Sequence, residues 1–449
     1  MGVHNRMRKV LIVTYYFPPS GGPGVQRVLK FVKYLPQFGF EPVVLTVSDG
    51  DYPAIDKSLL DAIPKDTEVI RTRIFEPYDL YRKFTGKKAG SAVDVENIPS
   101  GKKRRPIERL AEFIRSTVFI PDARIGWYRY AVPRGLEIIR NEGIDIIYSS
   151  SPPYTSALIA RTLKKKSGKP WVMGLRDPWT GFISAPERWF LPAAIDRHME
   201  KISVYTADKV EIAWEGIGKD LENKYGRIDA SRIEYIPNGY DPEDFPDVPK
   251  KADGKFRITY TGSMYGKRNP RTLLEAVKLL VKEGRVSSDN LSLVFAGRFG
   301  SEVKEMFAAP ELNGMIDARE YVPHEESIKL LLQSDALVLI VDKSELSSEI
   351  VPGKVFEYIG AKRPIIAFAP EGAAAQIVRK TGSGVVVAQD DVAQAKSVIA
   401  ALLQEHAEGK SSSGSIGNIF TPKEEVIREF ERKEATKKLA SLFTKILEK

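Results

Sequence analysis

Short apolar runs alternate, along the first half of the chain, with stretches whose apolar residues recur every three or four positions. RKVLIVTYYF (residues 8–17) is followed by VQRVLKFVKYLPQFG (25–39), and IDIIYSS (144–150) is followed by TSALIARTLKKKSG (155–168). The short runs are typical of buried strands and the periodic stretches of helices. Further strands are expected at EPVVLTV, PWVMGLRD, ADKVEIAW and RIEYIPNGYD. Strands that alternate with helices predict a parallel sheet covered by helices on both faces.

The same alternation begins again after residues 241–255, DPEDFPDVPKKADGK, which are charged, rich in proline and without periodicity. This segment is expected to be a linker between an N-terminal α/β domain (1–240) and a C-terminal one (256–422). The second half is predicted to contain the strands FRITYTGS, LSLVFAGR, EYV, DALVLIV, PIIAFAP and GSGVVVA and the helices PRTLLEAVKLLVKEG and HEESIKLLLQS. Residues 423–449 are amphipathic, and we expect one long helix that crosses back to the first domain.

Length and composition agree with two such domains. A chain of 449 residues is too long for one ordinary core, and its 43% hydrophobic residues are typical of a globular protein. The sequence has no cysteine, which excludes disulfides and every site that needs a thiolate. No apolar run approaches the roughly 18 residues that span a bilayer, and the N-terminus is interpreted as a first strand rather than a signal peptide. We therefore expect a cytoplasmic protein.

Residues 82–109 interrupt the alternation with many lysines and arginines, and the amphipathic stretch IERLAEFIRSTVFI follows them. The two together are interpreted as an insertion in the first domain. Residues 82–119 could bind an anionic membrane surface, which would place the protein peripherally on the inner face of the cell membrane, but a solvated loop explains the composition as well. The side chains expected toward the lipid are Phe84, Phe113, Val118 and Phe119. Nucleic acid is not an expected partner, because aromatic and basic residues do not interleave.

The stretch EIVPGKVFEY (349–358) contains a Pro-Gly-Lys turn directly after the apolar run ALVLIV. Proline suits the first position of a helix, so a helix is expected to begin at Pro352. The free N–H groups at such a helix start bind anions such as phosphate. Gly353 would let a ligand approach the backbone closely, and Lys354 would add a full positive charge.

Two glutamates, Glu349 and Glu357, lie on either side of this turn. Eight helical residues span roughly 12 Å, a length that suits a nucleotide-diphosphate sugar. One carboxylate could then accept hydroxyls of the sugar and the other the two ribose hydroxyls, with phosphate between them. Chance spacing, with Glu357 as a solvated helix acid, is the simpler alternative.

Three other features carry less weight. GGPGVQR (21–27) invites comparison with a dinucleotide-binding fingerprint, but Arg27 stands where the third glycine belongs, so no dinucleotide is assigned. The four histidines are scattered along the chain and form no metal-ligand pair, so no metal is expected. Asp177 ends an expected strand, where it could cap a turn or face a ligand.

Taken in order, these stretches resemble the retaining glycosyltransferases of family 4, the group 1 type, which have the GT-B fold. The Glu-x7-Glu pattern with GKVFEYIGAKRPIIAF resembles the family's donor site, and YYFPPSGGPGVQRVLKF resembles its glycine-rich loop and first helix. YIPNGYD resembles its interdomain turn, and YTGSMYGKRNPRTLLEAV the start of its donor domain. The resemblance covers nearly the whole chain. It implies an α/β protein of GT-B architecture, with two Rossmann-like domains whose parallel sheets face each other across a cleft.

The resemblance also implies roles for individual residues. The expected catalytic residues are Glu349, which would bind donor sugar hydroxyls near the reacting carbon, and Arg268 and Lys354, which would neutralise the diphosphate as it leaves. Glu357 would hold the ribose. The other residues expected at the donor are Gly21, Gly22, Gly24, Lys267, Arg298, Val322 and Gly353. The residues expected on the acceptor side are Arg27, Ser151 and Asp177.

Two departures from the family pattern affect these assignments. The usual glycine–arginine pair of the donor domain is Gly262–Ser263 here, so Arg268 would have to supply that cation. The family's mid-domain histidine has no obvious counterpart before His198. Residues 149–151 or Asp177 could occupy that space.

The predicted function is transfer of a hexosyl-type sugar, with retention, from a UDP- or GDP-linked donor to an acceptor hydroxyl. The expected acceptor is a glycan or a lipid-linked intermediate of bacterial cell-surface polysaccharide or glycolipid synthesis, and no cofactor or metal is expected beside the donor. Two alternatives stay open: a nucleotide-sugar epimerase of the same architecture and a non-catalytic membrane-associated binding protein. An epimerase needs acid–base residues on both faces of the sugar, and the N-terminal domain shows no convincing pair.

Overall fold

The computed structural model describes residues 6–52, 54–75, 116–181, 188–226, 228–249, 251, 253–342, 347–349, 351–408 and 419–448. These residues form two compact units. The first contains the described residues up to Asn238 together with those from Arg432 onward, and the second contains those from Gly239 to Glu431. The chain thus enters the second unit directly after Asn238 and returns to the first at Arg432.

A seven-stranded parallel sheet forms the centre of the first unit, in the order β3-β2-β1-β4-β5-β6-β7. In the middle of the sheet, Val10 of β1 lies opposite Ile146 of β4. All five residues of β5 are buried, as expected of a parallel strand covered on both faces. The strands are β1 (Arg8–Val13), β2 (Phe40–Val47), β3 (Glu68–Thr72), β4 (Ile146–Ser151), β5 (Trp171–Leu175), β6 (Lys209–Ile212) and β7 (Ile233–Tyr235).

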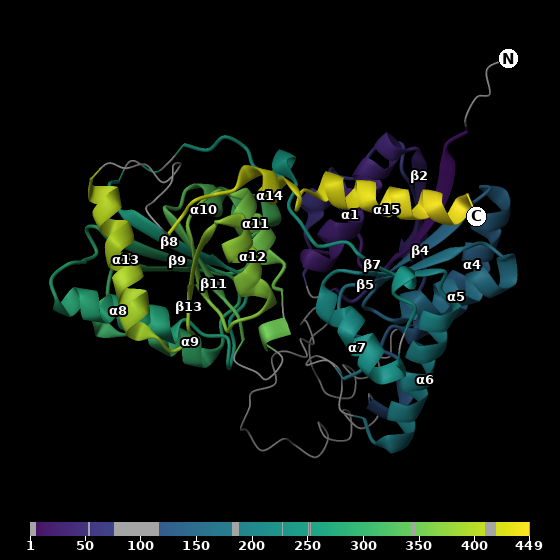
Figure 1. Ribbon diagram of the computed structural model, residues 1–449, viewed down its shortest axis with the longest axis horizontal. Helices are drawn as coiled ribbons and strands as arrows, with labels where there is room; N and C mark the ends of the chain where they lie inside the picture. Colours follow the sequence, from purple (N-terminus) through teal and green to yellow (C-terminus); the bar gives the residue numbers. More distant parts are fainter. Residues whose placement is uncertain are drawn as a thin grey trace. The chain divides into compact units, whose positions relative to one another are not determined.

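Helices cover this sheet, and the last helix of the chain is one of them (Figure 1). Figure 1 shows α15 alongside α1, and Leu439 and Phe443 of α15 join Val28 of α1 in one buried apolar cluster. Phe443 also meets Phe40 of β2 edge to face, at 5.4 Å between ring centroids. The helices of the first unit are α1 (Pro23–Tyr34), α4 (Tyr128–Asn141), α5 (Thr155–Ser167), α6 (Phe190–Thr206), α7 (Glu215–Tyr225) and α15 (Arg432–Leu447).

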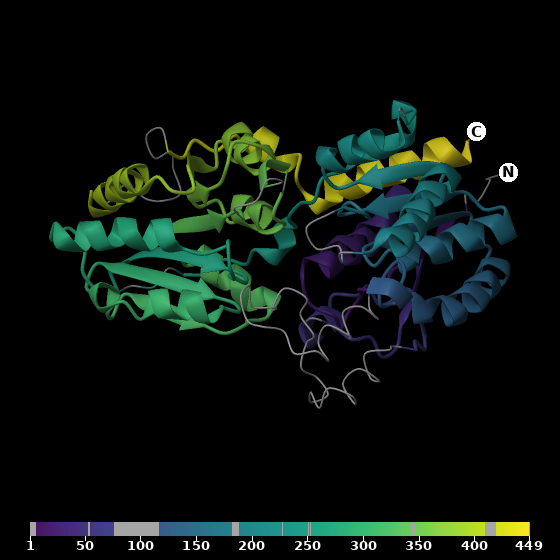
Figure 2. The same cartoon turned by 90° about the horizontal axis from the view of Figure 1, so that it is seen from below.

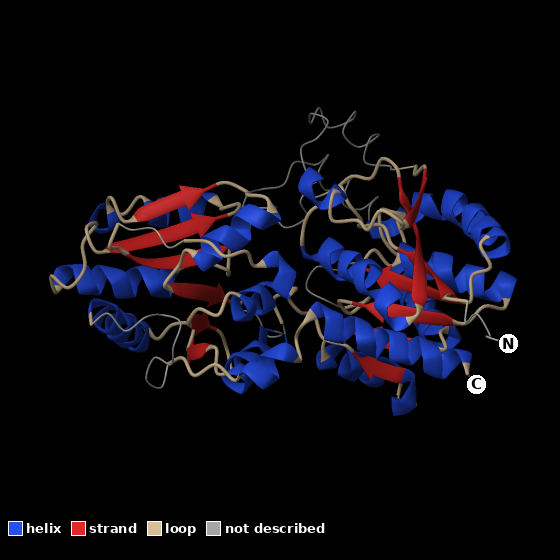
Figure 3. Ribbon diagram, turned by 90° about the horizontal axis from the view of Figure 1, so that it is seen from above, coloured by secondary structure: helices blue, strands red, loops and turns tan. Residues whose placement is uncertain are grey.

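The second unit is built on a six-stranded parallel sheet in the order β10-β9-β8-β11-β12-β13. Figure 2 shows helices on both sides of this sheet, and Figure 3 shows strands between helices in each unit. The strands are β8 (Phe256–Thr261), β9 (Leu291–Ala296), β10 (Ile316–Arg319), β11 (Ala336–Ile340), β12 (Ile365–Phe368) and β13 (Gly384–Val387). The helices are α8 (Arg271–Lys282), α9 (Ser301–Phe307), α10 (His324–Leu332), α11 (Lys354–Gly360), α12 (Ala373–Thr381), α13 (Val392–Ala407) and α14 (Glu424–Arg428). No helix in the described part of the chain is long and apolar enough to cross a membrane.

One predicted strand of the second unit is displaced along the chain. Residues 320–322 (EYV) are not a strand; the strand is β10, just before them. β10 lies at the edge of the sheet and carries the ion pair of Asp317 with Arg319, whose Nη2 lies 2.7 Å from Oδ2. Edge strands tolerate charge that a central strand does not, so an apolar pattern does not reveal this one.

The single long helix predicted at residues 423–449 is wrong, because the structure contains α14 and α15 with a break between them. The backbone carbonyl of Phe430 accepts a hydrogen bond from the N–H of Tyr240, which takes it out of a helical ladder. Ile427 and Phe430 pack in an apolar cluster of the second unit, whereas Leu439 and Phe443 pack in the first. The apolar residues of this segment thus serve two different cores.

The predicted linker at 241–255 begins inside the second unit. Asp241 is buried, and its carboxylate accepts a hydrogen bond from the N–H of Glu243 at 3.1 Å. Phe245 meets the ring of Tyr240 edge to face and is packed against the same cluster as Phe356. These first residues are therefore folded structure and not a free connection.

Candidate functional site

In the second unit, Lys354 lies against the end of β8. Its Nζ donates a hydrogen bond to the Tyr260 hydroxyl at 2.8 Å and lies 4.1 Å from the centroid of that ring. The Tyr260 hydroxyl in turn donates to the carbonyl oxygen of Ser263 at 3.0 Å. Burial raises the pKa of Tyr260, so the phenol stays neutral and holds the ammonium group as an acceptor.

Gly262 is the residue that makes room for this lysine. Its φ is +122°, in a region that L side chains rarely adopt, and a Cβ there would lie 2.3 Å from Nζ of Lys354. A second tight contact joins the loops after β8 and β9, since a Cβ on Gly297 would lie 2.1 Å from the carbonyl oxygen of Gly262. Glycine at both positions therefore lets two loops and a cation meet at the carboxyl edge of the sheet.

Arg268 lies in the same loop, between β8 and α8, and pairs with Asp342, two residues after the end of β11. Nε of Arg268 lies 2.6 Å from Oδ1, and Nη2 lies 3.1 Å from Oδ2. Both side chains remain partly exposed. Two parallel bonds of this kind fix the plane of a guanidinium group. Arg268 is thus a cation held in one orientation at the edge where ligands of α/β sheets bind.

Glu357 lies on α11 beside His324, the first residue of α10. Oε1 of Glu357 is 3.7 Å from Nδ1 of His324, and the other ring nitrogen is 3.5 Å from Oδ2 of Asp244. The histidine thus stands between two carboxylates. Tyr358, the next residue of α11, is buried and accepts a hydrogen bond from the N–H of Thr261 at 3.0 Å, which ties α11 to the end of β8.

The other acid of the sequence motif, Glu349, ends a short 3-10 turn (Ser347–Glu349) and is exposed. Among the described residues, none forms a hydrogen bond or an ion pair with its carboxylate. The helix expected to start at Pro352 starts instead at Lys354, with Gly353 as its N-cap, and has only seven residues. In so short a helix the charge of Lys354 outweighs the helix dipole as an attraction for phosphate.

Arg298 and Val322, expected beside the nucleotide base, lie at the ends of β9 and β10. The guanidinium of Arg298 lies 5.9 Å from the centroid of the Tyr321 ring. Its backbone oxygen accepts a hydrogen bond from the N–H of Met264 at 2.9 Å. Val322 packs against a small buried cluster that includes Ala296 and Leu330.

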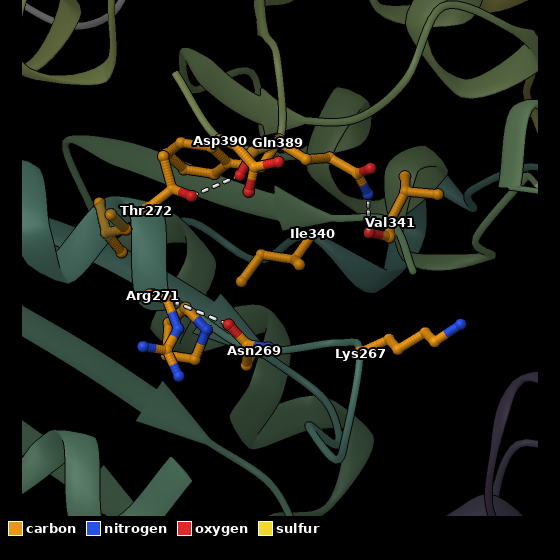
Figure 4. A pocket seen from close by; sticks show the side chains of 11 residues that line it. Lys267, Asn269, Arg271, Thr272, Ile340, Val341, Gln389 and Asp390 are labelled. Atoms are coloured by element: carbon orange, nitrogen blue, oxygen red, sulfur yellow. Dashed lines mark hydrogen bonds between the residues drawn. The ribbon is translucent and has the colours of Figure 1, made fainter. Parts of the chain in front are cut away.

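Lys267 lines a separate pocket of about 120 Å³ between the start of α8 and the ends of β11 and β12. Figure 4 shows its side chain directed away from the other lining residues. The polar groups inside are bonded to one another: Gln389 donates to the carbonyl oxygen of Val341 at 2.6 Å, and the hydroxyl of Thr272 donates to the carbonyl oxygen of Gln389. Lys267 thus lines this pocket, whereas Arg268 pairs with Asp342, the residue after the lining residue Val341.

In the first unit, Arg27 is fully buried and not on an acceptor surface as expected. Its guanidinium binds the buried carboxylate of Glu211 and donates to Asn238 Oδ1 at 2.9 Å and to the carbonyl oxygen of Ile236 at 2.7 Å. Glu211 also accepts from the hydroxyl of Tyr148 at 2.9 Å. Helical periodicity places Arg27 on the inner face of α1, where a buried charge needs such partners. These contacts place the Arg27 side chain in the interior of the first unit.

The glycine loop before α1 supports the carboxyl edge of the first sheet. Gly22 has φ +99° and is the N-cap of α1, and the N–H of Gly21 donates to the carbonyl oxygen of Ala54 at 2.9 Å. A Cβ on Gly24 would lie 2.1 Å from Nη1 of Arg176. A side chain at position 24 would therefore displace the Arg176 guanidinium, a contact that the sequence does not reveal.

Arg176 connects the acceptor-side residues predicted from the sequence. Its backbone N–H donates to the carbonyl oxygen of Ser151 at 2.9 Å, and its guanidinium donates to the carbonyl oxygens of Ser151 and Pro152. The Ser151 hydroxyl is buried, and no described residue forms a hydrogen bond with it. Burial raises the pKa of Asp177, and the neighbouring Arg176 opposes that rise. Ser151, Arg176 and Asp177 thus form one polar group at the ends of β4 and β5.

Family models match both units. Residues 241–413 match the model described as glycosyl transferases group 1, and residues 22–244 match the model described as glycosyltransferase family 4. The chain belongs to the group 1 glycosyltransferases. Among curated protein sequences, none matches this glycosyltransferase significantly.

Solved structures match this glycosyltransferase over almost its whole length. HepE of Anabaena, solved with UDP and glucose, is 13% identical, with 98% of this chain and 99% of that chain covered and a TM-score of 0.59. WaaG, described as a glycosyltransferase involved in lipopolysaccharide biosynthesis, is 14% identical, with 97% and 99% covered and a TM-score of 0.55. A putative UDP-N-acetylglucosamine 2-epimerase from Listeria monocytogenes is 13% identical, with 98% and 97% covered and a TM-score of 0.55. At identities this low the structural matches show the fold alone. Together with the two parallel sheets, these matches confirm the predicted α/β GT-B class.

Several residues of the glycosyltransferase's candidate site were missed by sequence reasoning. They are Tyr260, His324 as a neighbour of Glu357, Asp342 and Arg176. Asp342 directly follows the predicted strand DALVLIV, and Arg176 is the next-to-last residue of the predicted strand PWVMGLRD. A position at the carboxyl end of a strand is a usable signal. The roles of Tyr260 and His324 depend on contacts distant in the sequence, for which no local signal exists.

Proposed function

We propose that the protein transfers a hexosyl group, with retention, from a UDP- or GDP-linked sugar to a hydroxyl of a glycan or lipid-linked acceptor in bacterial cell-surface polysaccharide or glycolipid synthesis. Family membership supports glycosyl transfer. The observation that carries the donor assignment is the pair of oriented cations at the carboxyl edge of the second sheet: Lys354 on Tyr260 and Arg268 on Asp342. Both cations come from loops that follow strands, where ligands of such sheets bind.

The proposed chemistry requires stabilisation of a leaving diphosphate. As the bond from the anomeric carbon to the phosphate oxygen breaks, negative charge grows on the diphosphate, and oriented cations stabilise that charge more than they stabilise the ground state. Lys354 and Arg268 are both held by a partner before any ligand arrives. They would therefore need little reorganisation during the reaction.

The two glutamates would position the ends of the donor. Glu357 lies on α11, a helix held in place by buried residues, and would accept the ribose hydroxyls. Glu349, which is exposed, would accept hydroxyls of the sugar. A carboxylate is a suitable acceptor for two adjacent hydroxyls. Arg298 and the backbone near Val322 would border the base.

The acceptor half of the proposal lies in the first unit. Asp177 can bind an acceptor hydroxyl, and Arg176 can neutralise an acid group beside it. Ser151, expected on the same side, is fully buried and would act only through the backbone that Arg176 binds. We also propose that residues 82–119 bring the protein to an anionic membrane surface. Most of that segment lies outside the described residues; Val118 is exposed and Phe119 half-buried.

The proposal is tested by incubating the protein with individual UDP- and GDP-sugars in the absence of acceptor. Transferases release nucleoside diphosphate and free sugar slowly under these conditions, because water replaces the acceptor. We expect such release for one donor, with the freed sugar first seen in the anomeric form of the donor by NMR. Formation of a new nucleotide sugar would instead identify an epimerase, and the absence of both binding and turnover for all donors would favour a non-catalytic protein.

A further inference from the structure

Large apolar side chains gather on the surface of the first unit at the start of α6. Phe190 is 79% exposed, Leu191 47% and Trp189 42%. Ala194 and Ile195 follow one turn later on the same face and are also exposed. Single exposed apolar residues are ordinary, but a contiguous group of this size indicates a surface that binds something.

The segment before this helix adds to the same surface. Trp189 donates its indole N–H to the hydroxyl of Thr117 at 3.1 Å, and Val118, the next residue, is 62% exposed. Arg188 anchors the residues around Val118, since its guanidinium donates to the backbone oxygens of Phe119 and Pro121 at 3.1 and 2.7 Å. The apolar group is therefore anchored to the fold.

The outer face of α6 carries positive charge and no acid. Arg197, His198 and Lys201 are exposed, and they follow the apolar residues at helical spacing. The two acids of this helix, Asp196 and Glu200, are both buried. All the acidic charge of α6 thus points into the unit.

Both acids have partners inside the unit. Asp196 accepts a hydrogen bond from the indole N–H of Trp179 at 2.8 Å and pairs with Arg188 at 3.0 Å. Glu200 accepts from the hydroxyl of Tyr225 at 2.8 Å and lies 3.4 Å from Nζ of Lys224. These contacts fix which face of α6 is outward, so the separation of acid from the apolar and basic residues is built into the fold.

We propose that this α6 surface lies on a bilayer that contains anionic lipid. The α6 surface is defined by Val118, Trp189, Phe190, Leu191, Ala194, Ile195, Arg197, His198 and Lys201. An apolar group that enters the acyl region, beside cations that meet anionic headgroups, is the pattern of a helix lying in the membrane interface, and tryptophan favours that depth. The absence of exposed acid on α6 favours a negatively charged bilayer over a protein partner of mixed charge. The α6 surface shares Val118 with the segment 82–119 proposed above to meet a membrane, but its other residues lie outside that segment. It does not depend on the proposed reaction.

The test is co-sedimentation of the full chain with vesicles of phosphatidylcholine alone and of phosphatidylcholine mixed with phosphatidylglycerol. We expect binding to the mixed vesicles at low salt. Replacing Phe190 and Leu191 by serine together should lower the apparent partition coefficient by about tenfold or more, because two large apolar groups no longer enter the bilayer. Replacing Arg197 and Lys201 by glutamine together should have a similar effect, about fivefold for each charge. Leu279→Ser, at an exposed leucine of α8 in the second unit, is the matched control and should bind as the parent chain does.

Three results would overturn the proposal. The parent chain could fail to bind both kinds of vesicle. The Phe190/Leu191 variant could bind as well as the parent, which would assign binding to another segment such as the basic insertion. Sedimentation velocity without vesicles could show that the parent is a dimer and that this variant is a monomer, which would make the surface an interface between copies of the chain. Thermal stabilisation by nucleotide sugar, a property of the second unit, should be unchanged in every α6 variant, so failure here stays distinct from failure of the proposed function.

Discussion

Arg268 and Asp342 form a two-point ion pair, with Nε 2.6 Å from Oδ1 and Nη2 3.1 Å from Oδ2. The two residues follow β8 and β11, which are neighbours in the sheet of the second unit although 74 positions separate the residues in the sequence. The aspartate fixes the direction of a cation that the proposed mechanism assigns to the leaving diphosphate. In that proposed mechanism Asp342 would act as a positioning residue, and its effect should be visible apart from that of Arg268.

Asp342→Asn should lower kcat/KM for the donor by roughly tenfold to a hundredfold, because a loosely held Arg268 is misplaced in the transition state. The matched control is Asp317→Asn, which breaks a similar two-point pair with Arg319 on the edge strand β10. That variant should leave kcat/KM within about twofold of the parent, because a surface ion pair contributes less than about 1 kcal/mol. Equal losses in the two variants would show a general effect of removing an ion pair.

Gly262→Ala should abolish donor binding without unfolding the protein. Its Cβ would occupy the place of the Lys354 ammonium, at 2.3 Å, so the lysine must leave Tyr260. Gly284→Ala is the control, because Gly284 also has positive φ, +66°, but nothing lies within 4 Å of its added Cβ. Both variants should lose about 1–3 kcal/mol of stability to backbone strain. Calorimetric titration with the preferred nucleotide sugar should show normal affinity only in Gly284→Ala, and normal affinity in both would remove Lys354 from the site.

Arg27→Met should destabilise the first unit by about 3–5 kcal/mol, because it leaves the Glu211 carboxylate buried without its cation. Adding Glu211→Gln should restore a measurable part of that loss, since the amide is neutral and can still accept from Tyr148. Urea unfolding followed by tryptophan fluorescence measures this unit alone, because all five tryptophans belong to it. A stable Arg27→Met protein with impaired transfer would return Arg27 to the acceptor side.

The contribution of Asp196 to the unfolding free energy of the first unit should fall as pH rises from about 4 to about 6. Burial raises its pKa from 3.8 to about 6, despite the hydrogen bond from Trp179 and the charge of Arg188. The folded state thus holds the proton more tightly than the unfolded state, and stability is highest below the unfolded pKa and falls until the folded pKa is passed. The shift of 6 − 3.8 = 2.2 corresponds to about 3 kcal/mol at 1.36 kcal/mol for each unit of pKa. The difference in unfolding free energy between the parent and Asp196→Asn should fall by about that amount across this window, whereas a constant difference would contradict the assignment.

The order of strands and helices could be predicted because most strands are buried on both faces. β11, for example, is five buried apolar residues, and a short run of this kind is typical of a central parallel strand. β10 was misplaced because an edge strand can carry Asp317 and Arg319. The break before α15 was missed because both halves of the segment are amphipathic, and only the hydrogen bond from Tyr240 to Phe430 shows where the helix stops.

In the candidate site, too, local spacing could be predicted from the sequence, whereas contacts between distant residues could not. That Lys354 and Glu357 lie close together could be predicted because one short helix carries both, and local spacing is visible in a sequence. The partners that hold them come from elsewhere: Tyr260 lies 94 positions before Lys354, and no periodicity connects the two. Arg27, expected on the acceptor side from the resemblance, is buried instead, and the sequence does not show its partner Glu211, which lies 184 positions away.

The most direct test of the central claim is a thermal-shift titration of the parent chain and of Lys354→Met with individual UDP- and GDP-sugars. A ligand that binds the folded state stabilises it by mass action, by about 2.7 kcal/mol at a ligand concentration of a hundred times Kd, and so raises Tm. The account predicts that one donor raises Tm of the parent, and that Lys354→Met melts near the parent temperature without ligand but loses the shift. A parent chain that no nucleotide sugar stabilises, or an unchanged shift in Lys354→Met, would contradict a donor site built on Lys354.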